Sequence, residues 1–78
     1  MPDFKSGIEN DKITNYLGRQ MTVDLKNHNK ITGSLGFYHL TEQMIHLTNW
    51  VEHDSEGKEV RKGNYMVINR TAWFQIYA

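Results

Sequence analysis

The stretch from Leu17 to Leu35 constrains the fold of this 78-residue chain more than any other part of the sequence. Apolar side chains alternate with polar ones over Met21–Leu25, and the alternation returns over Ile31–Leu35. A period of two is typical of strands with one buried and one solvated face. The polar residues 27–29 between the two runs suit a tight turn. The stretch therefore predicts an antiparallel hairpin, and Gly33 on its apolar face suits a sharply bent strand.

These residues resemble the first motif of the Sm/LSm family. The chain reads Leu-Gly-x-x-hydrophobic-Thr-Val-x-Leu-Lys-Asn, followed by hydrophobic-x-Gly-x-Leu. A looser match extends over nearly the whole chain. The resemblance implies an all-β fold with a short N-terminal α-helix, namely a small, strongly bent, five-stranded antiparallel barrel. It also implies assembly into rings that bind single-stranded, often U-rich, RNA.

The remaining chain fits a single domain over residues 1–78. Apolar residues at three- and four-residue spacing predict a helix over about 7–17, and Gly18 is a suitable stop. The barrel is expected over about 20–78. On the third strand we expect Val51 to share a face with Ile45 and Leu47, with Trp50 on the other face. The later strands are expected at Met44–Val51, Tyr65–Ile68 and Ala72–Tyr77, with a kink or bulge at Gly63-Asn64 before the fourth.

Composition narrows the function. A core of this size typically supplies only ~3–5 kcal/mol, so oligomerisation is a common remedy. The chain has no cysteine, no apolar run of membrane-spanning length and no signal peptide, which favours a cytoplasmic protein. Its formal net charge is zero, which disfavours a dedicated duplex-DNA binder. Nucleic acid would have to be bound by a few residues multiplied by symmetry.

Catalytic and metal-binding patterns are absent from the sequence. The four histidines match no compact zinc spacing, and no cysteine assists them. The paired carboxylates have neither a partner base nor a nucleophile, and there is no Gly-rich phosphate loop. We therefore expect no enzyme activity, no metal and no cofactor.

The resemblance places RNA-binding residues in two loops. The first family loop reads Phe-Asp-x-x-Met-Asn, and here Tyr38 takes the Phe position, His39 the Asp and Gln43 the Asn. A register one residue later would put Met44 on the Asn. An aromatic or imidazole plane stacks a base, and the Gln amide reads a base edge as Asn does. Core packing is the alternative role for Tyr38.

The second family motif reads hydrophobic-Ile-Arg-Gly-Asn, and here Asn69-Arg70 follows Ile68. Arg70 could stack on a base or meet a phosphate, and its alternative role is an ion pair between subunits. Asn69 is a turn residue first and a base contact second. Together the two loops give the candidate RNA-binding residues Tyr38, His39, Gln43, Asn69 and Arg70.

The last strand is apolar or aromatic on both faces and would be an exposed edge in a monomer. We expect the fourth strand to pair with the fifth strand of a neighbour, in a ring of five to seven subunits according to the resemblance. The expected interface residues are Tyr65, Val67, Trp73, Phe74 and Ile76. The preferred function is therefore a ring that binds single-stranded RNA as a scaffold or chaperone in a ribonucleoprotein. The alternative is a ring-forming structural or protein-interaction module that does not bind RNA.

Overall fold

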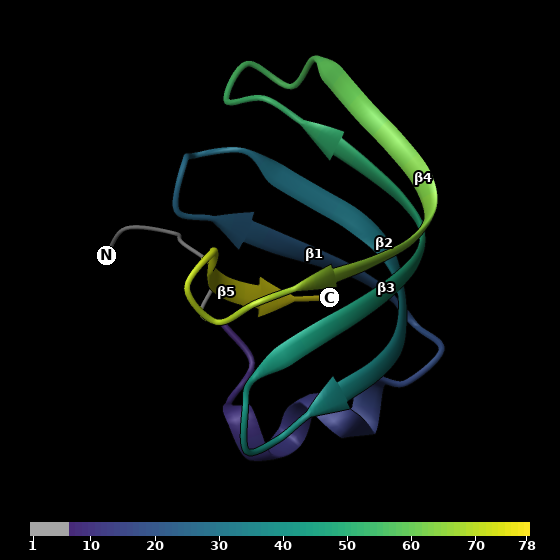
Figure 1. Cartoon of the computed structure of the whole chain (residues 1–78), viewed down its shortest axis with the longest axis vertical. Coiled ribbons are helices and arrows are strands. Elements are labelled where there is room, and N and C mark those ends of the chain that lie inside the picture. The colour runs from purple at the N-terminus through teal and green to yellow at the C-terminus, as the bar shows by residue number, and fades with distance from the viewer. Residues whose placement is uncertain (1–6) are drawn as a thin grey trace.

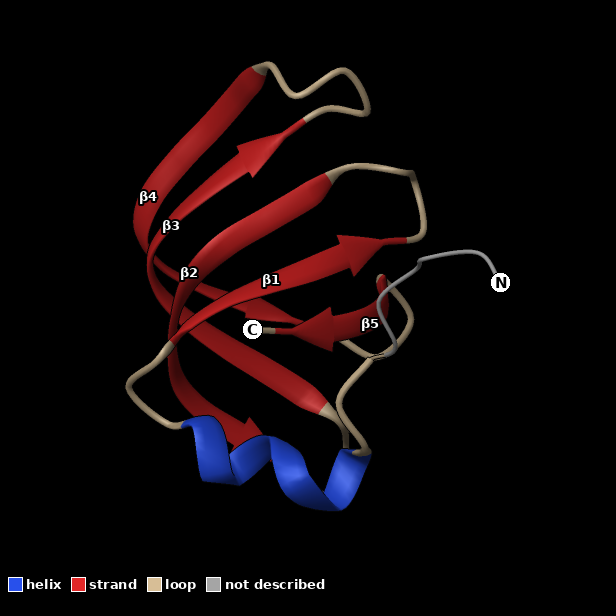
Figure 2. Ribbon diagram, turned by 180° about the vertical axis from the view of Figure 1, so that it is seen from behind, coloured by secondary structure: helices blue, strands red, loops and turns tan. Residues whose placement is uncertain are grey.

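A computed structural model of the chain describes residues 7–78, which form one short helix and five strands (Figure 1). All neighbouring strands are antiparallel, in the order β4-β3-β2-β1-β5, and the sheet bends strongly around its core. The helix lies across one end of the sheet (Figure 2). The bent five-stranded sheet was predicted, and it remains open between β4 and β5. The elements are η1 (Asn10–Tyr16), β1 (Gln20–Leu25), β2 (Lys30–His39), β3 (Met44–His53), β4 (Glu59–Ile68) and β5 (Trp73–Tyr77).

The helix is shorter and tighter than predicted, because η1 is a seven-residue 3₁₀-helix and not an α-helix over 7–17. Its sequence contains β-branched and asparagine residues, which have low helix propensity. The Asn10 side chain is engaged elsewhere, accepting from the Tyr38 hydroxyl and donating to the Leu40 carbonyl. Glu9 at the N-cap makes no side-chain cap. Tertiary contacts, with Ile13 fully buried, therefore hold this segment.

The predicted antiparallel hairpin of β1 and β2 is present. Met21 lies opposite Gly33, and Val23 lies opposite Ile31. A Cβ atom on Gly33 would lie 3.0 Å from the Thr48 carbonyl oxygen, so this glycine permits the close approach of β3. The left-handed turn residue is His28 (φ 76°), not an asparagine.

The third strand differs from the prediction because Asn49 adopts a left-handed backbone (φ 50°). The β2–β3 register shifts between Thr32 and Ser34, opposite this residue. Trp50 consequently points into the core, and Val51 is only partly buried. The expected sharing of a face by Ile45, Leu47 and Val51 was therefore wrong, since the alternation resets at the bulge.

The fourth strand runs without interruption through Gly63-Asn64, where a kink or bulge was expected. Thr48 pairs with Tyr65 and Trp50 with Gly63, in one constant register. Gly63 makes room instead for the Trp50 ring, because a Cβ atom there would lie 2.9 Å from the indole. The core lies inside the bend and contains Ile13, Met21, Val23, Ile31, Leu35, Tyr38, Ile45, Leu47, Trp50, Ile68, Trp73 and Ile76.

The buried Glu52 carboxylate on β3 links the β1–β2 turn to the edge strand β4. One Glu52 oxygen accepts from Asn29 Nδ2 at 2.7 Å, and the other accepts from Arg61 Nε and Nη2 at 2.9 and 2.6 Å. Burial alone would raise the pKa of Glu52, but the hydrogen bonds from Asn29 and Arg61 outweigh it and hold this pKa below its usual value. The charged form is therefore part of the folded structure.

Candidate nucleic-acid interface

The two loops singled out by the sequence meet at one end of the sheet. Ile45, at the start of β3, pairs with Ile68 at the end of β4, so the connections 40–43 and 69–72 lie side by side. The indole N–H of Trp73 donates a hydrogen bond to the main-chain oxygen of Gln43 at 2.8 Å. Gln43 itself is left-handed (φ 56°), and its N–H donates to the His39 carbonyl oxygen. Trp73 thus fixes the first loop against β5.

Arg70 is held against the same tryptophan. Its Nη1 donates to the Trp73 carbonyl oxygen at 2.7 Å, and its guanidinium carbon lies 4.6 Å from the centroid of the indole ring. Within residues 7–78, no carboxylate forms an ion pair with Arg70. Its guanidinium is therefore held in place by Trp73.

Gln43 and Arg70 border one hollow of about 260 Å³. Trp73 and Phe74 form its aromatic wall, and Asn10 lies at its rim with the segment that precedes η1. An amide that can donate and accept, a guanidinium and aromatic surface are the groups that recognise unstacked bases and phosphates. Asn10 was not expected here, because it reaches the site only through tertiary contacts with the distant residues Tyr38 and Leu40.

The other three candidate residues lie outside this hollow. Tyr38 is 2% exposed and belongs to the core, the alternative weighed for it. The β2–β3 register shifts between Leu35 and Phe37, which turns Phe37 outward and Tyr38 inward. His39 lies on the outer face, where its ring contacts those of Phe37 and His46. Asn69 is exposed in its turn, and its carbonyl oxygen accepts from the Ala72 N–H at 2.9 Å.

The expected interface residues also divide into two groups. Three of them are exposed on the two edge strands, namely Phe74 (64% exposed) on β5 and Tyr65 (57% exposed) and Val67 on β4. Trp73 and Ile76 are instead buried in the core. The β1–β5 register shifts between Asp24 and Leu25, so two residues three apart on β5 both face inward. Trp73 and Ile76 could therefore meet a neighbouring copy only through their main chain, and their place at an interface stays a prediction.

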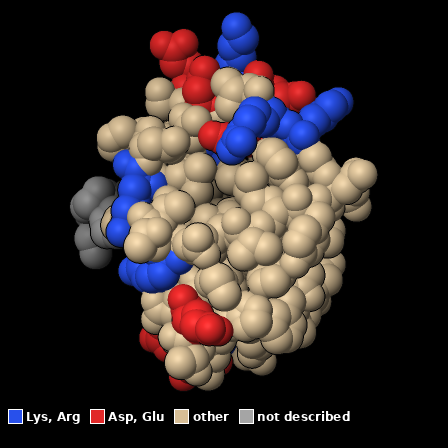
Figure 3. Space-filling view, in the orientation of Figure 1, with Lys and Arg blue, Asp and Glu red and all other residues tan. Residues whose placement is uncertain are grey.

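Charged groups gather at the upper end of the face shown in Figure 3 and along one side, whereas a broad area below carries few of them. Within the described part of the chain, no three His, Asp or Glu side chains are grouped to hold a metal ion. No helix in that part is long and apolar enough to cross a membrane.

The fold of this chain is that of the Sm-like proteins. An Sm-like protein (AF-SM2) from Archaeoglobus fulgidus superposes with a TM-score of 0.73 at 22% identity, covering 94% of this chain and 96% of that one. The SmAP (LSm) protein from Methanococcus vannielii gives 0.74 at 19% identity, covering 96% and 100%. A chain of the NatC complex bound to CoA gives 0.70 at 18% identity, covering 97% and 86%. No family model matches the sequence, and no curated protein does.

Proposed function

We propose that this chain assembles through its edge strands β4 and β5 into a ring and binds single-stranded RNA as a scaffold or chaperone. The observation that carries the proposal is the hydrogen bond from Trp73 to Gln43, which brings the two loops together around one hollow. In this role the chain is a cytoplasmic ribonucleoprotein component. It needs no cofactor or metal and carries out no catalysis.

RNA recognition at this site follows from three groups. The Gln43 side-chain amide can hydrogen-bond to a base edge, and the Arg70 guanidinium can meet a phosphate or stack on a base. The Trp73 indole is the third group, because it donates to the Gln43 main-chain oxygen and lies against the Arg70 guanidinium. Tyr38 contributes from the core, where its hydroxyl donates to Asn10 at the rim of the hollow. His39 and Asn69 lie beside the loops, where a longer strand could reach them.

The proposed assembly follows from the two edge strands of the sheet. Within residues 7–78, β4 pairs with no strand except β3 and β5 with none except β1, so these two are the edge strands of the sheet. The Ile8 N–H donates to the Ile76 carbonyl oxygen of β5 at 2.8 Å, and pairing with a neighbour over that residue would replace this bond. Exposed edges template pairing with another chain. Pairing β4 of one copy with β5 of the next is heterologous and closes a ring when the rotation closes. The resemblance to Sm-like proteins implies five to seven subunits.

Fluorescence anisotropy with short oligo-U, oligo-A and scrambled RNA tests the site. Arg70→Ala should weaken RNA binding by about tenfold, the loss of one charge-assisted contact. Gln43→Gly removes the amide without straining the left-handed backbone, and it should also weaken binding. Arg19→Ala is the matched control, because the Arg19 guanidinium lies 5.2 Å from the centroid of the Tyr16 ring but does not line the hollow. Unchanged affinity in both site variants would reject this RNA site.

A ring-forming protein-interaction module is the second candidate. It is favoured by the likeness to a chain of the NatC complex and by the formal net charge of zero. This candidate predicts an oligomer by light scattering and no anisotropy change with any of the three RNAs. RNA binding that is sensitive to Arg70→Ala would exclude it as the sole function.

A further inference from the structure

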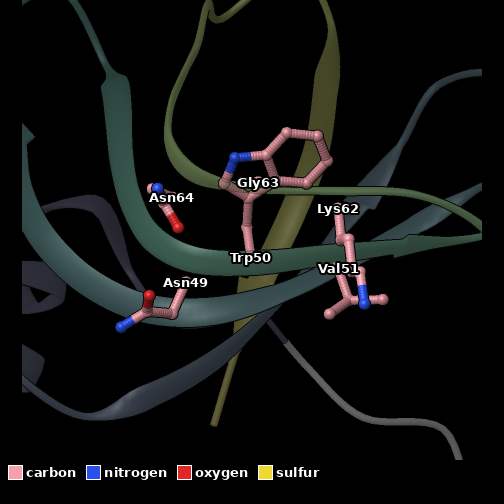
Figure 4. A pocket seen from close by; sticks show the side chains of 6 residues that line it. All are labelled: Asn49, Trp50, Val51, Lys62, Gly63 and Asn64. Atoms are coloured by element: carbon pink, nitrogen blue, oxygen red, sulfur yellow. The ribbon is translucent and has the colours of Figure 1, made fainter.

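A second hollow lies beside the middle of β4, away from Arg70, which follows the C-terminal end of that strand. It has a volume of about 460 Å³ and is lined by Asn49, Trp50, Val51, Lys62, Gly63 and Asn64 (Figure 4). This volume is within the usual range of about 300–1,000 Å³ for small-ligand sites. The Trp50 side chain crosses from β3 to lie over β4 at Gly63, with the two asparagines on one side and Lys62 on the other.

Trp50 carries an unused hydrogen-bond donor at this site. The residue is only 8% exposed, yet its indole N–H is buried and has no partner among the described residues. The other tryptophan provides a contrast within the same chain, because the Trp73 indole N–H is bound to Gln43. A buried donor without a partner costs about 1–3 kcal/mol, so an acceptor brought by a ligand would be favoured there.

The charges around the hollow favour an anion. Lys62 lines it, and no ion pair joins Lys62 to a carboxylate in the described chain. The neighbouring Arg61 lies 5.6 Å from the centroid of the Trp50 ring but is already paired with Glu52. None of the described residues that line the hollow is a carboxylate. Lys62 is therefore the cation available to a phosphate.

The hollow would also stay accessible in the proposed ring. The strand β4 has ten residues and β5 has five, so pairing over Tyr65–Ile68 leaves the Gly63 half of β4 uncovered. The two asparagine amides can each donate and accept toward a base edge. A nucleotide would match all of these groups. Its base offers an acceptor to the indole N–H and hydrogen-bonding edges to the amides, and its phosphate would meet the Lys62 ammonium.

We infer that the hollow beside Trp50 binds a nucleotide, with its phosphate on Lys62 and its base toward Asn49, Asn64 and the indole N–H. The nucleotide is either a free mononucleotide or one unit of an RNA strand, since both present the same groups. The site belongs to each chain by itself, so it does not rest on RNA binding at Gln43 and Arg70.

Indole N–H signals in a ¹H–¹⁵N NMR spectrum of the full chain test the inference, because the chain has two tryptophans and each reports one site. Trp50→Phe and Trp73→Phe assign the two signals. Titration with AMP, UMP, CMP or GMP should move the Trp50 signal saturably and leave the Trp73 signal in place when the source is a free nucleotide. Movement of the Trp50 signal only with short RNA identifies a unit of a strand.

Substitution of the cation provides the second measurement. Lys62→Ala should weaken the Trp50 response by about tenfold, whereas Lys58→Ala, a nearby lysine that does not line the hollow, should leave it unchanged. The inference is overturned by a stationary Trp50 signal with every nucleotide and RNA, by equal affinities of Lys62→Ala and the unsubstituted chain, or by a full response to inorganic phosphate alone. If the Trp73 signal does not move when RNA is added, that result would count against the RNA site at Gln43 and Arg70 instead.

Discussion

The indole N–H of Trp73 and the main-chain oxygen of Gln43 lie 2.8 Å apart and join two loops that are 30 residues apart in the chain. Trp73→Phe removes this donor and leaves the Gln43 carbonyl without it. We expect a loss of about 1–2 kcal/mol in the free energy of unfolding beyond the effect of the smaller ring, measured by urea denaturation.

Trp50→Phe is the control for that measurement, because it makes the same change of ring at an indole whose N–H has no partner within residues 7–78. The difference between the two variants isolates the hydrogen bond. Trp73→Phe should also weaken RNA binding, since Gln43 loses the contact that positions it. Equal stability losses in the two variants would show that the hydrogen bond contributes nothing.

The ion pair of Glu52 predicts a dependence of stability on acid. The folded-state pKa of Glu52 lies below its usual value of 4.5, so the folded chain binds fewer protons there than the unfolded chain. The resulting stability is complete above pH 4.5 and is lost as the pH falls through the folded-state pKa. Glu52→Gln should cost about 2 kcal/mol at neutral pH, since it removes the charge-assisted bonds from Arg61.

Urea denaturation of Glu52→Gln across the acid range provides the measurement. The variant should lose less stability between pH 5 and the acid limit than the unsubstituted chain does. Glu56→Gln, at an exposed turn position, is the control and should keep the steeper acid loss. A Glu52→Gln curve parallel to that of the unsubstituted chain would contradict this role of Glu52.

The two edge strands predict which exposed side chains control assembly. Tyr65→Glu on β4 or Phe74→Glu on β5 should place an unpaired charge at the contact between copies and give monomers by light scattering. Phe37→Glu is the control, because Phe37 is also exposed (49%) but lies on β2, an inner strand. Dissociation by Phe37→Glu alone would locate the interface elsewhere.

The salt dependence of RNA binding reports how many subunits engage a strand. One phosphate contact on single-stranded nucleic acid gives a slope of log affinity against log salt of ~−0.7, and a ring multiplies this by the number of engaged subunits. Arg70→Ala should bring the slope toward zero, because Arg70 is the cation at the site. Anisotropy titrations over a range of salt measure both slopes, and an unchanged slope in the variant would assign the phosphate contact to another residue.

The sequence predicted the elements whose signal is local. The alternation over 21–35 predicted the hairpin, and the resemblance predicted the bent sheet. The faces of Trp50, Tyr38 and Trp73 could not be read from alternation, because each lies next to a shift in strand register. Such a shift reverses the expected face of every residue that follows it.

The candidate site was predicted in part for a related reason. Gln43 and Arg70 follow strand ends that can be located from the sequence, so their convergence could be expected. The position of Asn10 at the hollow depends on its hydrogen bonds with Leu40 and Tyr38, which are distant in the sequence. A local sequence pattern does not predict such contacts. The left-handed backbone of Asn49 is likewise set by the approach of β2 and β3, not by its sequence neighbours.

Because β4 and β5 end the same sheet, every copy carries one edge of each kind. A copy whose β4 cannot pair still has a β5 that can pair. Such a copy can add to an incomplete ring and then block the addition of the next copy. In an assembly that closes by such pairing, a closed ring requires every position to be sound. The yield of closed rings in a mixture therefore falls as the sound fraction raised to the number of subunits, so one-sided copies remove a larger share of the rings than their own share of the mixture.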